Sequence, residues 1–269
     1  MAKYKKKRAR ELKHDRFRDT TILLADRLAE RVAGRGRQML YGLGVILILA
    51  AAAYGVVRWR NKHAEEAEQA MGRAILIARA EISATPNPNS KDPVFTTEQE
   101  RAQRTIDEFQ KVADKYGEPY RTQARYFIAT SLLVTDHQKA LSELQTLASG
   151  SGEVAVLSKF ALAQAKEADV SYDQAVALYS ELATMNSSVV TRETANLRLA
   201  AVYQKQGKKK EAADVLFNIV SQARQAKDKD GKPVPESSAS REATQELLKL
   251  DPARHAQLPP APVTSDLSF

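Results

Sequence analysis

Side chains that commonly catalyse reactions or bind metals are few and scattered in this chain of 269 residues. Its four histidines, His14, His63, His137 and His255, lie far apart, and no two have the spacing that puts metal ligands on one helical face. The absence of cysteine excludes thiol nucleophiles, zinc–cysteine sites and disulfides. The sequence also lacks a glycine-rich phosphate loop and a nucleophile elbow, so we expect no metal site and no cofactor.

Acidic residues are plentiful, but their pattern is that of a solvated helix surface. Pairs such as Glu65/Glu66 and Asp107/Glu108 lie in stretches that also carry Lys and Arg. General acid–base catalysis would instead need a carboxylate or a histidine that is buried and paired at the binding surface, and the sequence offers no candidate. We therefore expect a protein that is not an enzyme and has no catalytic residues.

Small and large apolar residues recur with a period of about 35 residues. Ala140, Ala175 and Ala212 each precede one large apolar residue by four positions and another by seven, and Thr105 begins the same pattern one period earlier. A small residue lets two helices approach closely, and the large ones fill the space between them. The pattern predicts stacked helix pairs whose packing residues are Phe109, Val112, Ala129, Ala140, Leu144, Leu147, Ala163, Ala175, Tyr179, Leu182, Ala200, Tyr203, Ala212, Leu216 and Ile219.

The elements that must position these residues are helices, because the chain after residue 64 is rich in Ala, Leu, Glu, Lys and Gln. Thr97 with Glu100 and Ser171 with Gln174 form predicted capping boxes, and Asp136 is a further predicted cap. Helices are expected over about 62–82, 97–116, 119–134, 137–148, 153–168, 172–185, 190–206, 209–226 and 239–249.

An uncharged stretch extends from Met39 to Val57. A helix of this length spans roughly 28 Å, close to the hydrocarbon core of about 30 Å in a bilayer. A cleaved signal peptide is the alternative, but such peptides have a short basic region before their apolar run, and here that region is long. We therefore predict a single transmembrane helix over 39–57 that is not cleaved and contacts the lipid bilayer.

Net charge is divided unevenly about this stretch. Residues 1–38 contain 13 Lys/Arg and 5 Asp/Glu, a net charge of +8, whereas the remaining residues contain 28 of each sign. A Lys/Arg excess keeps its side of a first span in the cytoplasm, with Arg35 and Arg37 next to the span as topology residues. The basic tail could bind nucleic acid, but it has no base-reading pattern, so attraction to anionic lipid is favoured and no nucleic acid partner is expected.

The predicted organisation has eight parts. They are a basic cytoplasmic tail (1–38), the transmembrane helix (39–57), a helical stalk (58–84), a linker (85–96), the repeat domain (97–226), a flexible loop (227–238), a capping helix (239–250) and a disordered tail (251–269).

One unit of the repeat carries a family resemblance. The pattern Leu199-Ala200-x-x-Tyr203-x-x-x-Gly207-x-x-x-x-Ala212-x-x-x-Leu216-x-x-Ile219 resembles a tetratricopeptide repeat. The layout from Met39 to about Ala226, including the span that runs into Val57-Arg-Trp-Arg60, resembles the YfgM-like family of ancillary Sec translocon subunits. The long basic tail and the loop after Ala226 depart from that family.

The resemblance implies an all-α fold with an N-terminal single transmembrane helix followed by a tetratricopeptide-like α-solenoid of about three to four helix pairs. It implies a location in the bacterial cell inner membrane, with a cytoplasmic N-terminus and a periplasmic C-terminal domain. The expected function is a protein-interaction scaffold whose partners are Sec translocon subunits, periplasmic chaperones or exported clients. A structural or assembly factor of a cell-envelope or division complex is the alternative, because such repeats bind many unrelated partners.

Overall fold

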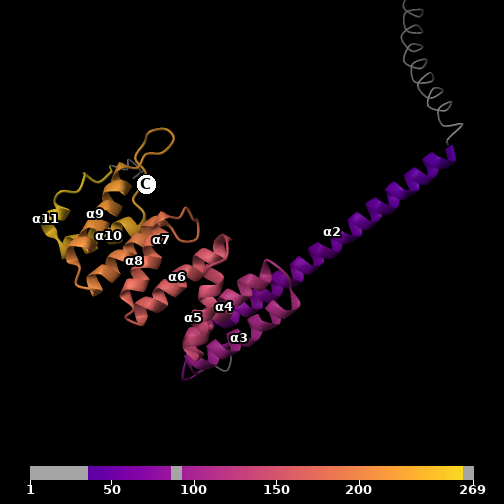
Figure 1. The fold of residues 1–269 in the computed structure, drawn as a ribbon, viewed down its shortest axis with the longest axis horizontal. Coiled ribbons are helices and arrows are strands. Elements are labelled where there is room, and N and C mark those ends of the chain that lie inside the picture. The colour runs from indigo at the N-terminus through magenta and orange to yellow at the C-terminus, as the bar shows by residue number, and fades with distance from the viewer. Residues whose placement is uncertain (1–35, 86–92, 263–269) are drawn as a thin grey trace, which may run out of the picture. The chain divides into compact units, whose positions relative to one another are not determined.

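The computed structural model of the protein describes residues 36–85 and 93–262, and it divides the chain into two compact units, Met1–Glu65 and Glu66–Phe269 (Figure 1). Its helices are α2 (Gly36–Ala78), α3 (Glu98–Lys115), α4 (Tyr120–Thr135), α5 (His137–Ala148), α6 (Gly152–Ala168), α7 (Tyr172–Thr184), α8 (Arg192–Lys205), α9 (Lys209–Gln225), α10 (Ser238–Leu250) and α11 (Pro252–His255). Two short strands are β1 (Glu81–Ile82) and β2 (Val94–Phe95).

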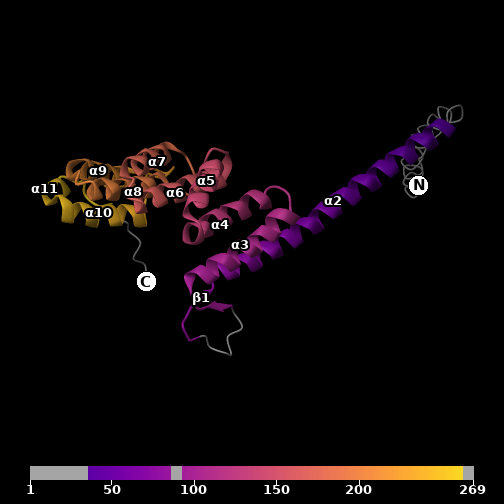
Figure 2. The same cartoon turned by 60° about the horizontal axis from the view of Figure 1, so that its bottom comes forward.

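The second unit is an array of consecutive helices. From α3 to α11, each helix packs against the next one in the chain, as the ribbon shows in two views (Figures 1 and 2). Beyond these neighbours, α4 contacts α6, α8 contacts α10, and α9 contacts α11. The predicted tetratricopeptide-like array of helix pairs is confirmed, since the units bury their apolar faces against the adjoining helices, and the described chain is mostly helical.

The buried residues form a series of clusters along the array. In the first, Ala67 and Met71 of α2 pack with Phe109 of α3 and with Tyr116, which directly follows α3. Phe109 also stacks on Phe127 of α4, with ring centroids 4.5 Å apart and planes inclined by 8°. Later clusters join α4 to α6, α6 to α8, and α8 to α10. The core therefore extends from repeat to repeat and holds α4 firmly between its neighbours.

Helix ends follow the local sequence closely. Each of the helices predicted between 97 and 249 begins and ends within two residues of its expected limits. Thr97 accepts a hydrogen bond from the Glu100 amide, and Asp136 accepts one from the Lys139 amide, as predicted. The capping box at Ser171 is wrong, because the Ser171 side chain makes no capping bond and its carbonyl oxygen accepts from the Gln174 amide instead.

Three segments differ from the sequence-based expectations. Helix α2 ends at Ala78 rather than near 82, and β1 then pairs in parallel with β2, which lies within the predicted linker. In the tail predicted to be disordered, α11 forms, because the Asp251 side chain caps it by accepting from the Arg254 amide. Leu258 packs against the last apolar cluster. The final residues, 263–269, lie outside the described residues.

The N-terminal part of the chain is described only from residue 36. Helix α2 covers 39–57 and continues to Ala78. Within the described ranges, no helix combines the length and the apolar character that crossing a membrane requires. The transmembrane assignment of 39–57 stays a prediction. Arg35 and nearly all of the basic tail lie outside the described residues, and the side chain of Arg37 is not described.

Candidate binding groove

The residues predicted to pack the repeats lie inside the array. The small ones at 129, 140, 163, 175, 200 and 212 are all fully buried. The large ones at 109, 112, 144, 147, 179, 182, 216 and 219 are buried as well, and Tyr203 is half-buried. These residues hold the helix pairs together and leave the outer faces of the helices for binding.

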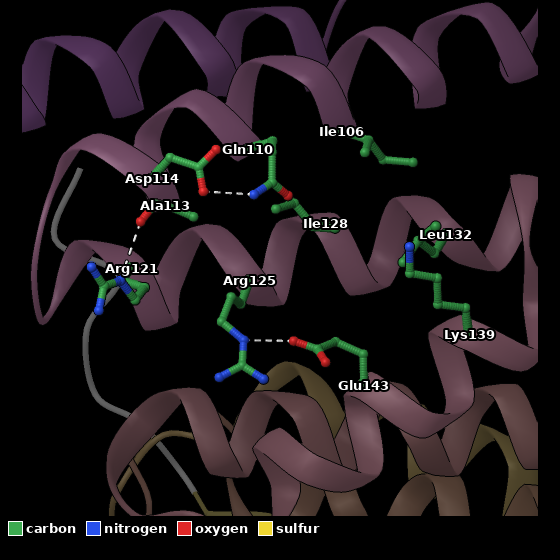
Figure 3. A pocket seen from close by; sticks show the side chains of 10 residues that line it. All are labelled: Ile106, Gln110, Ala113, Asp114, Arg121, Arg125, Ile128, Leu132, Lys139 and Glu143. Atoms are coloured by element: carbon green, nitrogen blue, oxygen red, sulfur yellow. Dashed lines mark hydrogen bonds and ion pairs between the residues drawn. The ribbon is translucent and has the colours of Figure 1, made fainter.

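A groove of about 450 Å³ runs along one face of α4 between α3 and α5 (Figure 3). Both flanking helices pack against α4, which therefore forms the floor. The α4 residues of the groove are spaced by three or four positions, the spacing that aligns side chains on one helical face. The lining comprises Ile106, Gln110, Ala113 and Asp114 of α3, Arg121, Arg125, Ile128 and Leu132 of α4, and Lys139 and Glu143 of α5.

Hydrogen bonds fix part of the polar lining. Arg125 Nε donates to Glu143 Oε1 over 2.6 Å and so bridges α4 and α5. The hydrogen bond with this carboxylate raises the pKa of Arg125 above its ordinary value. On the other wall, Gln110 Nε2 donates to Asp114 Oδ1 over 2.9 Å. These contacts pre-position the centre of the groove without a ligand.

Two cations of the groove keep unused donors. Arg121 donates only its Nε, to the carbonyl oxygen of Ala113 at 3.2 Å. Among the described residues, neither the Arg121 Nη atoms nor Lys139 Nζ has a hydrogen bond or ion pair, and both side chains are exposed. The groove therefore combines the half-buried apolar side chains of Ile106 and Ile128 with positive charge at Arg121 and Lys139 that no carboxylate in the described part of the chain pairs with.

A second polar constellation lies deeper in the array, where α6, α7 and α8 meet. The Glu167 side chain is only 4% exposed. Its Oε2 accepts from Tyr179 Oη and from Arg198 Nη2, both over 3.0 Å, and its Oε1 accepts from Lys205 Nζ over 2.7 Å. This network ties three helices of two adjacent repeats together.

The titration of this network follows from its geometry. Burial alone would raise the pKa of Glu167, but the donors from Lys205, Arg198 and Tyr179 outweigh it and hold the pKa below its ordinary value. Burial raises the pKa of Tyr179 to about 12. Glu167 is a buried carboxylate whose oxygens are all engaged by donors from neighbouring helices, so it is suited to holding helices together.

Comparison with solved structures shows similarity to helical repeat proteins. One is a Podosopora anserina putative kinesin light chain with nearly identical TPR-like repeats, at 18% identity and a TM-score of 0.45, covering 60% of this chain and 82% of the other. A second structure, of a variant of that protein, gives 17% identity and the same TM-score and coverage. No protein-family model and no curated protein matches the chain. Because the structural similarity is low, the fold assignment relies on the helix pairs themselves.

The sequence contained signals for both polar constellations. Arg121, Arg125, Ile128 and Leu132 follow the spacing of one helical face, and Arg198 and Lys205 are seven residues apart on α8. The pairing with Glu143 and with Glu167 depends on contacts between helices, which spacing alone does not give. Within the described residues, no three side chains of His, Asp or Glu gather to hold a metal ion.

Proposed function

We propose that this protein is an interaction scaffold, not an enzyme, and that it binds segments of other proteins along α4. The observation that carries the proposal is the groove between α3 and α5, which combines the half-buried apolar side chains of Ile106 and Ile128 with charged side chains. Partner surfaces of this kind use apolar burial for affinity and polar contacts for orientation. A scaffold role also fits the array, in which outer helix faces remain available after the core is formed.

Site-specific photo-crosslinking in native membranes tests this function. A photo-reactive amino acid at Gln110, which lines the groove on α3, should form adducts with partner proteins. The matched control is Arg104, which is also exposed on α3 but does not line the groove. Adducts at 110 and none at 104 support the proposal. Adducts at neither position, or equal adducts at both, contradict it.

We further propose that the segment from Met39 to Val57 anchors this scaffold in a bilayer. Two observations support it, namely the absence of charge over this stretch and the exposure of its apolar side chains, since Leu47, Ile48 and Leu49 are each more than 60% exposed. Exposed apolar side chains in such a run favour a lipid environment. The resemblance to YfgM-like proteins supports a location in the bacterial inner membrane with a periplasmic repeat domain.

The Sec translocon, periplasmic chaperones and exported clients are the partners that we propose on the same resemblance. Affinity purification of the full chain after mild solubilisation should recover translocon subunits. Recovery of an unrelated complex alone would refute this partner assignment. A septal or polar distribution in cells would favour the alternative, an assembly factor of the envelope or division apparatus, whereas an even membrane distribution favours the translocon.

A further inference from the structure

The groove along α4 has the length of a short extended peptide. From Arg121 to Leu132 the helix advances about 16 Å, at 1.5 Å per residue. In an extended chain of five residues, the first and fifth Cα atoms lie about 13 Å apart, at roughly 3.3 Å per residue, and the side chains at its ends reach further. In such a chain, side chains 1, 3 and 5 point to the same face.

The charges and the apolar residues of the groove follow a matching order. In Figure 3, Arg121 lies at one end of the labelled side chains, Lys139 lies at the other, and Ile128 lies between them. Ile128 and Ile106 are half-buried, so they keep apolar surface that a ligand can cover. The central Arg125 is already paired with Glu143, which leaves the cations at the two ends as the free positive groups.

We propose that the groove binds an extended, acidic peptide segment of the form acidic-x-apolar-x-acidic, a specification that rests on the binding function proposed above. The two acidic side chains pair with Arg121 and Lys139, and the central apolar side chain covers Ile128 and Ile106. Arginine donates two parallel hydrogen bonds to a carboxylate, so the Nη atoms of Arg121 provide a directional contact. The peptide contacts the α4 face between α3 and α5.

Asp114 opposes this ligand, because its carboxylate lines the same groove (Figure 3). Replacing it with asparagine removes the negative charge and keeps an oxygen that can accept from Gln110. Asp114→Asn should therefore strengthen the binding of an acidic peptide about threefold. A weaker complex after this change would contradict the proposed charge pairing.

Two peptides of identical composition test the register. The probe is fluorescein-labelled Glu-Ser-Leu-Ser-Glu with blocked ends, in which both acidic side chains share a face with the leucine. The control, Ser-Glu-Leu-Glu-Ser, puts the acidic side chains on the other face. With the full-length chain in mild detergent, fluorescence polarisation should show the probe to bind about fivefold more tightly than the control. Equal affinity for the probe and the control would show that binding is nonspecific electrostatic attraction, and it would overturn the proposal.

Substitutions of Arg121 and Lys139 test whether the probe peptide binds in the groove. Arg121→Gln and Lys139→Gln should each weaken the probe about threefold, and together about tenfold. Lys249→Gln on α10 removes the same charge from an exposed side chain outside the groove and should leave the affinity unchanged. An equal loss in all three single variants would overturn the site. Crosslinks at position 110 without any binding of the probe would refute the peptide motif and leave the scaffold function standing.

Discussion

Val170 combines a left-handed backbone conformation with an exposed apolar side chain, and both are unusual for valine. It is the non-glycine residue with positive φ in the described chain, at 60°, and its side chain is 66% exposed. Gly207 has the same place in the next repeat, five residues before the small residue of the following helix, with φ 75°. Both turns also share their hydrogen bonds, since the amide of Val170 bonds to the Glu167 carbonyl as that of Gly207 bonds to Gln204.

The turn therefore requires a left-handed residue, and a β-branched side chain is strained there. Val170→Gly should raise the free energy of unfolding by about 1 kcal/mol, because the strain relieved exceeds the added flexibility of the unfolded chain. Urea denaturation of the two proteins measures the difference. Gly207→Val is the reciprocal change and should destabilise by a similar amount. If Val170→Gly destabilises the protein instead, the left-handed turn geometry does not hold.

The lowered pKa of Glu167 predicts how the stability of the array depends on pH. Because its pKa in the folded protein is lower than its ordinary value of 4.5, its contribution to stability is present above pH 4.5 and is lost as the pH falls through the lowered pKa. Glu167→Gln should cost about 2 kcal/mol at neutral pH and flatten the loss of stability in acid. Thermal melts across this pH range measure both effects.

The control for this change is Glu246, which is 36% exposed and pairs within α10 with Lys249, which is 71% exposed. Glu246→Gln should cost less than about 0.5 kcal/mol and leave the acid dependence intact. Equal effects of the two substitutions would show that the network around Glu167 does not stabilise the junction between repeats.

At the scale of single helices, Thr97 and Ser171 have the same predicted capping pattern in the sequence, but only Thr97 caps its helix through its side chain. Thr97 accepts a bond from the Glu100 amide, whereas the Ser171 side chain caps nothing. Thr97→Ala should therefore destabilise the protein by about 1 kcal/mol, and Ser171→Ala should change it by less than a few tenths. Chemical denaturation of both variants distinguishes them. A large cost at Ser171 would contradict the turn described for α6 and α7.

The contact between α8 and α9 depends on small residues. Ala200 of α8 and Ala212 of α9 are both fully buried. Ala212→Asp should lower the free energy of unfolding by more than about 3 kcal/mol, because it buries a carboxylate that has no partner. The last repeat should then unfold before the others. Hydrogen exchange resolved by segment measures this. Lys210→Asp, on the exposed start of α9, is the control, and unchanged stability of Ala212→Asp would contradict the repeat register.

The sequence predicted these elements well because their causes are local. The period that places Ala140, Ala175 and Ala212 fixes the helix pairs, and the end of each helix follows from turn and cap residues nearby. The groove and the Glu167 network were not predicted, because each joins side chains from three helices. The strand pair β1–β2 was missed because it also depends on contact between separate segments: Val94, inside the predicted linker, pairs with Glu81.

At the scale of the whole molecule, charge divides the chain. The net charge of +8 belongs to residues 1–38, and the rest of the chain is neutral. If the proposed anchor spans a bilayer, this excess keeps the N-terminus in the cytoplasm. Protease added to spheroplasts should then remove the domain after residue 58, as detected with an antibody against it. Survival of that domain until the cells are lysed would reverse the proposed orientation.

Because each helix of the array packs mainly on its neighbours in the chain, its contacts close over short sequence distances. Chains of this kind can acquire structure progressively, starting from the end that is synthesised first. Helices α3 and α4 can stack as soon as both have emerged, while α8 to α11 are still being made. The groove needs only α3, α4 and α5, so it can receive a ligand before synthesis of the chain is complete.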